Sequence, residues 1–154
     1  MIVVGGTYRE FSWTPRIDRV GGSGLRAALV AQQLGRDVHL VSAAASGEDA
    51  LVAEAICNGL GLASSYRTRT LPIRFEYFTP LDTPALQGRE SQIEDLSPVT
   101  GGQVLAFGMI EGRPPIAADM VVIDPQQPLG LHGDVLAGVD AERVALVLNR
   151  AEAM

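Results

Sequence analysis

Apolar residues occur in two patterns along the sequence, and each pattern predicts a different kind of strand. Alternation of apolar and polar residues marks the segments 7–19 and 65–79, which predicts strands that are half exposed. Mostly continuous apolar runs are typical of strands covered on both faces of a parallel sheet. These runs are Ile2–Val4, Val38–Val41, Val104–Phe107, Met120–Ile123 and Val144–Leu148. We therefore expect a buried parallel sheet and a separate small sheet formed by the two alternating segments.

Two helices are predicted between the strands. A run rich in alanine and leucine follows a cluster of glycines, is apolar on nearly every side and stops at Gly35, where a helix would end. The second helix is predicted for Leu51–Asn58, with Leu51, Ala55 and Ile56 on one face. Residues 83–98 are expected to be a loop with a short helical turn, and residues 133–137 to start a helix. Apolar strands that alternate with helices predict an α/β domain.

The last residues of the sequence carry a helix-start signal. Asn149 and Glu152 have the spacing of a capping box, in which each side chain bonds the other residue's backbone. Only Ala153 and Met154 follow, so a full helix cannot form. On this ground we expect the chain to be cut inside a larger fold.

Composition narrows the classes of function. The 154 residues fit one domain, and a net charge of −6 argues against broad nucleic-acid binding. No apolar run approaches the roughly 20 residues of a membrane helix, so no membrane partner is expected. Cys57 is the single cysteine, which excludes an internal disulfide and favours a reducing, cytoplasmic location. The 12 basic residues are all arginine, so a Walker A loop, which needs lysine, is excluded.

The glycines at 21, 22 and 24 form the strongest chemical signal. A glycine-rich loop at a helix N-terminus presents backbone N–H groups to a polar or anionic ligand. The alternative interpretation is a tight turn that leads into a core helix. The segment Gly5–Glu10 does not fit a dinucleotide-binding fingerprint.

Several other side chains are candidates for binding a substrate or a metal ion. An ionised Glu10 can accept hydrogen bonds from hydroxyl groups, and Arg26 can pair with an acidic partner; Glu111 follows a predicted strand. The alternative for each of these three is a solvated surface charge. His39, His132 and Cys57 have no acid or thiol partners at ligand spacing, so they are interpreted as structural and no metal cluster is expected.

Taken in order, these features resemble the N-terminal half of the ribokinase-like (PfkB) carbohydrate kinases. The matching residues are Val3–Gly6 followed by Glu10, the loop Gly21–Gly24 with its helix, Leu34–Gly35 before Val38–Val41, the turn Gly47–Asp49, Asp124–Gln126, and Asn149 with Glu152. The ordered set spans essentially the whole sequence.

The resemblance implies a fold and a chemistry. The expected fold is a mostly parallel central sheet flanked by helices, with a small β lid formed by segments 7–19 and 65–79. The expected activity is transfer of the γ-phosphoryl group of ATP, with Mg²⁺, to a hydroxyl of a sugar, nucleoside or related polyol. Substrate contacts are expected at six residues: Glu10, Gly21, Gly22, Gly24, Arg26 and Glu111. Asn149 and Glu152 are expected to organise phosphate and Mg²⁺ largely through water, with no direct metal ligand.

Three departures from the family pattern qualify this expectation. Glu10 stands where aspartate is usual, and Arg26 stands where many relatives have asparagine, so Arg26 can pair either with an acidic substrate or with Glu10. The Gly-Ala-Gly-Asp segment that supplies the catalytic base is absent, so the C-terminal half of the fold is expected to be missing and the 154 residues alone are expected to be inactive. The alternative function is a non-catalytic small-molecule-binding module, or a homodimer formed through the lid.

Overall fold

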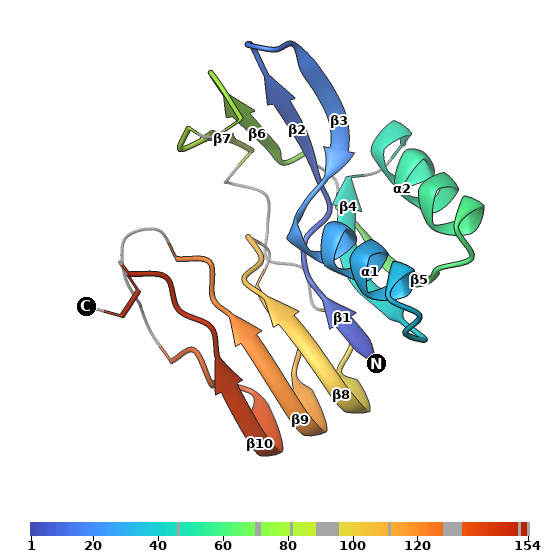
Figure 1. Ribbon diagram of the computed structural model, residues 1–154, viewed down its shortest axis with the longest axis vertical. Helices are drawn as coiled ribbons and strands as arrows, with labels where there is room; N and C mark the ends of the chain where they lie inside the picture. The colour runs from blue at the N-terminus through green and yellow to red at the C-terminus, as the bar shows by residue number, and fades with distance from the viewer. Residues whose placement is uncertain are drawn as a thin grey trace.

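The computed structural model describes two sheets and two helices (Figure 1). The described residues are 1–45, 47–69, 72–80, 82–88, 96–110, 112–127, 134–150 and 152–153. The larger sheet has six strands in the order β10-β9-β8-β1-β4-β5. Its strands are β1 (Ile2–Val4), β4 (His39–Ala45), β5 (Ala63–Arg69), β8 (Val99–Phe107), β9 (Ile116–Asp124) and β10 (Val139–Leu146).

Every strand pair of the larger sheet is parallel. Val3 of β1 lies opposite Leu40 of β4 on one side and Leu105 of β8 on the other. The neighbours Val3 and Val4 belong to separate apolar clusters, because successive side chains of a strand point to opposite faces. The predicted α/β class with a mostly parallel central sheet is confirmed.

Both helices pack against the β1, β4 and β5 part of this sheet. Helix α1 (Ser23–Gln33) buries Leu25 and Ala28, but Val30 and Leu34 on its other side are exposed. The prediction that this helix is buried nearly all round is therefore wrong, because the sheet covers only one of its faces.

Helix α2 (Glu48–Gly59) buries Ala53 and Cys57, and Ile56 packs partly against the same core. Leu51 and Ala55, which the sequence places on one face with Ile56, are exposed. The helix begins three residues earlier than predicted, at Glu48. Two acidic residues in its first turn favour this start by interacting with the helix dipole.

The first part of the predicted lid segment 65–79 belongs to the larger sheet instead. Strand β5 pairs in parallel with β4, with Tyr66 opposite Ser42. Residues 63, 65 and 67 are exposed on one face of β5, while Tyr66 packs on the other face against the cluster that holds both helices. An edge strand with only one covered face gives the same alternation as a lid strand, which explains the error.

The smaller sheet has four strands in the order β3-β2-β6-β7 and is called the lid below. They are β2 (Tyr8–Ser12), β3 (Ile17–Gly21), β6 (Arg74–Tyr77) and β7 (Ala85–Gln87). Phe75 and Tyr77 lie in this lid, and the rings of Tyr8 and Phe75 pack with centroids 5.1 Å apart. Residues 83–98 were predicted to be a loop, and this is wrong for Ala85–Gln87, which form β7. Residues 89–95 lie outside the described part.

The lid lies beyond the carboxyl ends of the larger sheet's strands, and β1 runs directly into β2 (Figure 1). Strand β1 is also the point where the chain changes direction across the sheet. Strands β4 and β5 follow on one side of it, and β8, β9 and β10 follow on the other. Such a switch point leaves a crevice outside the carboxyl ends of the strands, where ligands bind in open α/β sheets.

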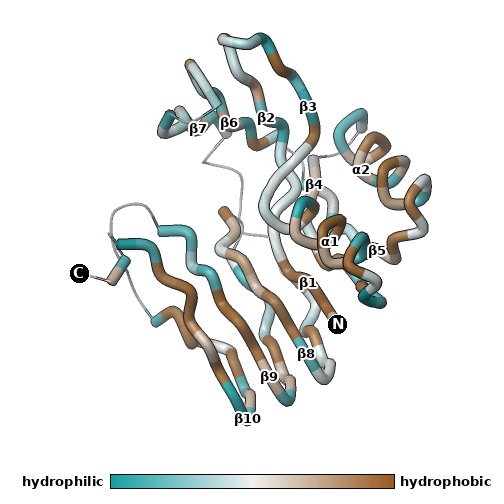
Figure 2. The backbone as a smooth tube through the Cα atoms, viewed as in Figure 1, coloured by the Kyte–Doolittle hydropathy of each residue, from teal (hydrophilic) through white to brown (hydrophobic). Residues whose placement is uncertain are grey.

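The β8–β10 part of the sheet is less covered than the sequence predicted. Apolar residues run through the middle of these strands (Figure 2). The predicted helix at 133–137 is wrong for residues 134–137, which form a turn, and residue 133 lies outside the described part. The end of the last strand is exposed at Val144, Leu146, Val147 and Leu148, although a buried strand was predicted, because β10 is an edge strand without a helix against it in the described residues.

In the described residues, no helix is long and apolar enough to cross a bilayer.

Candidate functional site

The glycines between β3 and α1 are required by close backbone packing. A Cβ atom on Gly24 would lie 2.4 Å from the carbonyl carbon of Gly5, and one on Gly22 would lie 2.3 Å from the carbonyl oxygen of Gly6. Gly22 also has a φ of +106°, which side chains disfavour. The loop therefore lies directly against the β1–β2 connection, and this contact accounts for two of the three glycines without a ligand.

Glu10 in β2 lies at the centre of a charged cluster at the base of the lid. Its side chain is only 8% exposed, and Arg19 and Arg26 pair with it while remaining 59% and 53% exposed. Arg26 Nη1 and the backbone N–H of Gly22 both donate to Glu10 Oε1, the latter at 3.1 Å. Arg19 donates to Oε2 from Nε at 3.1 Å, and its Nη2 lies at the same distance from that oxygen.

This pairing changes the expected role of Glu10. An ionised carboxylate has about four acceptor positions, and Glu10 makes four contacts with nitrogen atoms. Of the two partners predicted for Arg26, an acidic substrate or Glu10, the structure contains the second. The groups that remain exposed beside Glu10 are therefore the guanidinium groups of Arg19 and Arg26.

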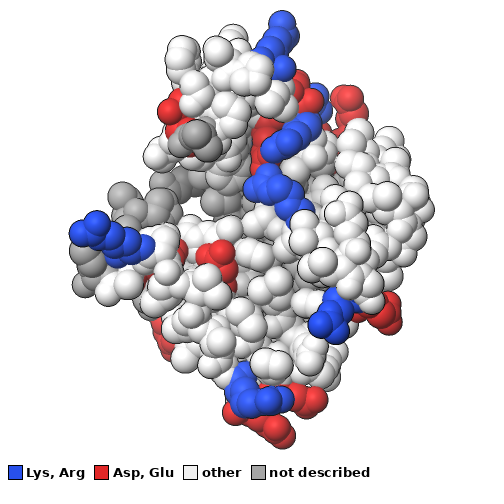
Figure 3. Space-filling model, in the orientation of Figure 1, with Lys and Arg blue, Asp and Glu red and all other residues white. Residues whose placement is uncertain are grey.

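The lid cavity is the space of about 180 Å³ beside this cluster. It is lined by Glu10, Phe11, Ser12, Ile17, Arg19, Arg26, Tyr77 and Pro80. Ser12 Oγ is buried and has no hydrogen-bond partner among the described residues. Burial, reinforced by the charge of Glu10, raises the pKa of Tyr77, so its hydroxyl stays protonated. Figure 3 shows basic and acidic atoms side by side over the base of the lid.

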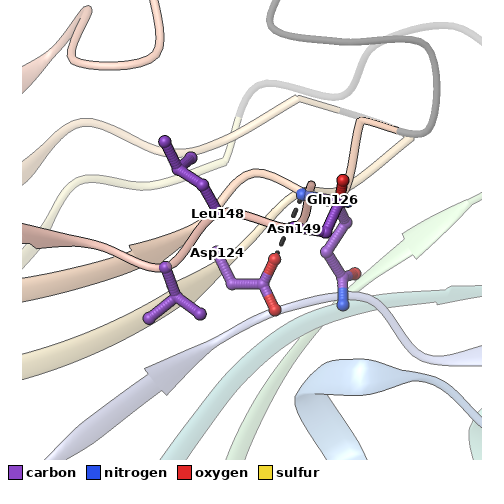
Figure 4. Close-up of a pocket in the computed structure, with 5 residues that line it drawn as sticks. Asp124, Gln126, Leu148 and Asn149 are labelled. Atoms are coloured by element: carbon purple, nitrogen blue, oxygen red, sulfur yellow. Dashed lines mark hydrogen bonds between the residues drawn. The ribbon is translucent and has the colours of Figure 1, made fainter. Parts of the chain in front are cut away.

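A second space, the strand-end pocket, lies where β9 and β10 end. Its volume is about 390 Å³, and its lining residues are Asp124, Gln126, Val147, Leu148 and Asn149 (Figure 4). Asp124 Oδ1 accepts a hydrogen bond of 3.2 Å from the backbone N–H of Gln126. Burial raises the pKa of Asp124, and the charge of Glu152 raises it further against this hydrogen bond. The pocket thus holds a carboxylate that is not paired with a cation in the described residues.

Asn149 and Glu152 form the predicted capping box. The Asn149 N–H donates to Glu152 Oε2 at 2.9 Å, and the Glu152 N–H donates to Asn149 Oδ1 at 3.0 Å. Glu152 is buried, and its other oxygen accepts from the backbone N–H of Gln127, 25 residues earlier in the chain. Glu152 therefore joins the loop after β9 to the loop after β10.

The predicted site residues fall into two groups. Glu10 and Arg26 line the lid cavity, and Gly21 and Gly22 lie against Glu10, with a Cβ on Gly21 blocked by Glu10 Oε2 at 2.7 Å. Gly24 packs against Gly5 and is not part of the cavity lining. Asn149 and Glu152 lie at the strand-end pocket. Glu111 and His132 lie outside the described residues.

The residues interpreted as structural lie away from both spaces. His39 Nε2 and Ser65 Oγ are 2.7 Å apart, which links β4 to β5. Cys57 is fully buried, with its Sγ 3.3 Å from the Tyr66 hydroxyl.

Arg19, Ser12 and Tyr77 were not predicted to be part of the site. The hairpin register carries a signal for Arg19, because Arg19 lies directly opposite Glu10 on β3. Aligning the two alternating halves of segment 7–19 would have paired these opposite charges. Ser12 and Tyr77 carry no comparable signal, since only the pairing of β2 with β6 brings them together.

The oxygen ligands available at the strand-end pocket fit a hydrated magnesium ion. Mg²⁺ is bound through one or two carboxylates and retains several waters, and Asp124 offers one carboxylate beside a wide space. Glu152 is buried and engaged with two backbone N–H groups, so its fit is that of an orienting group. No group of three or more metal-binding side chains exists in the described parts of the chain.

Comparison with known proteins supports the fold through solved structures. No family model matches the sequence, and no curated protein matches it. The crystal structure of a protein named Sa239 superposes with a TM-score of 0.64 at 11% identity, covering 99% of this chain and 61% of that one. A sulfate complex of a pyrophosphate-dependent kinase in the ribokinase family gives 0.51 at 12%, covering 80% and 50%. The microbiome-derived acarbose kinase Mak1 gives 0.50 at 11%, covering 96% and 68%.

These comparisons establish a fold and a length relationship. The chain spans between 50% and 68% of the length of these three solved chains. The predicted resemblance is confirmed at the level of structure, and the chain has the fold of the ribokinase-like carbohydrate kinases.

Proposed function

We propose that this chain supplies the acceptor-binding half of an enzyme that transfers a phosphoryl group to a hydroxyl of a sugar, nucleoside or related polyol. The observation that carries the proposal is the position of the lid cavity. It is lined by the lid strands β2, β3 and β6 and by Arg26 of α1, and β2 follows directly on β1, the switch point of the parallel sheet. In the proposal, the acceptor occupies this cavity and the loop Gly21–Gly24 positions it.

The strand-end pocket is proposed to serve the phosphoryl donor. Asp124 would hold hydrated Mg²⁺ there, and the ion would neutralise charge on the phosphates. Asn149 and Glu152 would act by fixing the two loops after β9 and β10. Because one structural neighbour is a pyrophosphate-dependent kinase, both ATP and pyrophosphate are donors to be tested.

The base that removes the acceptor proton is proposed to lie outside these residues. Transfer needs a group that takes the proton from the attacking hydroxyl. Glu10 is the carboxylate of the lid cavity, and its acceptor positions are occupied by Arg19, Arg26 and Gly22. It is therefore unsuited to this step, which agrees with the expectation that the 154 residues alone are inactive.

The same observation favours a second candidate function. A cavity with fixed hydrogen-bond donors and, in the described part of the chain, no available base fits a module that binds a small molecule without reacting with it. The lid also exposes Trp13 and Phe78, which are compatible with the homodimer predicted from the sequence.

Phosphorus-31 NMR separates the two functions. The longest product of the gene that contains this chain would be incubated with Mg²⁺, either ATP or pyrophosphate, and a panel of sugars, nucleosides and polyols. The proposal expects a new phosphomonoester signal that the Asp124→Asn variant strongly reduces. Binding of panel compounds without any phosphomonoester from either donor would overturn phosphoryl transfer and support the module.

A further inference from the structure

We propose that the molecule bound in the lid cavity carries an anionic group, a carboxylate or a phosphate, which Arg19 and Arg26 hold. The inference builds on the proposed function, because it names the chemical class of the acceptor. Glu10 then acts as a positioning residue for the two arginines and does not itself bind acceptor hydroxyls.

The charge balance of the cavity supports an anion. Two guanidinium groups face one carboxylate, which leaves one excess positive charge among the residues that line the cavity, in a chain whose net charge is −6. The neighbouring group of Arg9, Arg74 and three acids carries one excess negative charge, and it is engaged in ion pairs of its own. Arg9 binds Asp18 at 2.7 Å and Asp49 at 3.0 Å, and Arg74 pairs with Glu76 at 3.1 Å. None of these acids contacts Arg19 or Arg26 in the described ion pairs.

The two arginines also have donors to spare. A guanidinium has five N–H donors, and Arg26 gives one nitrogen and Arg19 two nitrogens to Glu10. More than half of each side chain remains exposed beside the cavity. Because Glu10 already fixes both groups, little side-chain entropy remains to be lost when a carboxylate or phosphate binds them.

Ser12 adds an independent sign of a missing ligand. Its side-chain oxygen is buried, lines the cavity and has no hydrogen-bond partner among the described residues. An unsatisfied buried hydroxyl is energetically unfavourable, and a ligand that hydrogen-bonds to it would remove that cost. The residue is only 4% exposed, so it fits a ligand that enters the cavity fully.

A neutral polyol fits this chemistry less well. Recognition of neutral hydroxyl groups uses acceptors as well as donors, and the acceptor positions of Glu10 are occupied. The cavity of about 180 Å³ is smaller than a drug-sized pocket of about 300–1,000 Å³. The two guanidinium groups therefore match a carboxylate or a phosphate, and the volume limits the ligand to a small molecule without separating an acid from its neutral parent.

Matched ligand series test the inference by binding alone. The longest product of the gene that contains this chain would be titrated calorimetrically with several aldohexoses, their aldonates and their 6-phosphates, without a phosphoryl donor and at low and high salt. We expect an acidic member to bind roughly tenfold or more tightly than its neutral parent, with the preference reduced by salt, since about 1.4 kcal/mol corresponds to tenfold. The aldonate and phosphate arms show which anionic group is preferred.

Variants assign the preference to the cavity. Arg19→Gln and Arg26→Gln should each lower the ratio of acidic to neutral affinity severalfold, with folding checked by circular dichroism. Arg36→Gln, an exposed arginine outside the cavity lining, is the matched control and should keep the ratio. Ser12→Ala should weaken acidic and neutral ligands alike.

Three results would overturn the inference: neutral sugars binding as tightly as their acids, no panel member binding, or a preference that survives both arginine variants. Because the readout is binding, such a failure is distinguishable from a failure of phosphoryl transfer, which the NMR assay decides separately.

Discussion

The lid cavity and the strand-end pocket each contain a carboxylate, but the two carboxylates differ in how their charge is compensated. Glu10 is buried but surrounded by two arginines and a backbone N–H. Asp124 has one backbone N–H and the negative Glu152 nearby, and its pKa is raised. The first charge is compensated by arginines of the chain, whereas the described residues place no cation beside the second. A buried carboxylate beside a cavity can therefore hold other side chains of the protein in place, or it can remain available to bind a cation.

Breaking the backbone contact beneath the lid cavity should have the largest effect. Gly24→Ala places a Cβ atom 2.4 Å from the carbonyl of Gly5. Because neither backbone segment can easily move, we expect a loss of about 3 kcal/mol in the free energy of unfolding. Urea denaturation measures this loss.

Gly59→Ala is the control for this effect, since a Cβ there meets nothing within 4 Å. It should be neutral or stabilise by up to about 1 kcal/mol. Equal losses for the two variants would mean that the glycine loop is not held by this contact.

Removing the charge at the centre of the lid cluster should have the next largest effect. Glu10→Gln leaves two arginines without their partner and removes an acceptor for the Gly22 N–H. We expect a loss of about 2 kcal/mol, less than for a fully buried pair, because both arginines are half exposed.

Chemical denaturation checks the Glu10 prediction, with the exposed Glu142→Gln as a control that should stay within about 0.5 kcal/mol. A stability equal to that of the control would show that the cluster is not a scaffold.

The corresponding change at the strand-end pocket should cost less. The two carboxylate oxygens of Glu152 accept hydrogen bonds from the backbone N–H groups of Gln127 and Asn149. In Glu152→Gln an NH₂ group takes the place of one oxygen, so one of these two hydrogen bonds is lost. The expected loss is about 1 kcal/mol, as for other capping side chains.

Amide hydrogen exchange sharpens this prediction, because the N–H groups of Gln127 and Asn149 should exchange faster in the variant while those of β1 do not change. Unchanged protection at both positions would contradict the proposed link between the two loops.

Asp124→Asn should produce the smallest change, and in the opposite direction. The pKa of Asp124 is raised by burial, so its stabilising contribution is present below the unfolded value of 3.8 and is lost as pH rises through the folded value. The variant lacks this loss and should melt slightly higher at neutral pH.

Magnesium ions should reverse the order of these melting temperatures if Asp124 holds Mg²⁺ as proposed, because binding would stabilise the wild type and the variant would lack the carboxylate. Thermal melts at pH 4 and pH 7, with and without Mg²⁺, measure both effects. A variant that responds to Mg²⁺ as the wild type does would remove Asp124 from the proposed cation site.

Part of this protein was predictable from local pattern. Continuous apolar runs predicted β1, β4, β8 and β9, because strands buried on both faces need apolar residues at every position. The spacing of Asn149 and Glu152 predicted their reciprocal hydrogen bonds, since a capping box depends on four consecutive residues. The glycines at 22 and 24 predicted a tight loop before α1 for the same local reason.

Tertiary structure decided which sheet each half-exposed strand joined. Alternation shows that one face of a strand is covered but not what covers it, so β5 and β6 looked alike in sequence although they joined different sheets. The pairing of β2 with β6 also brought Ser12 and Tyr77 to one cavity. Glu10 acquired its partners in the same way, because Arg19 and Arg26 reach it only after the hairpin and α1 pack together. The sequence alone determined the charges and their local geometry, and packing determined which of them remained available to a ligand.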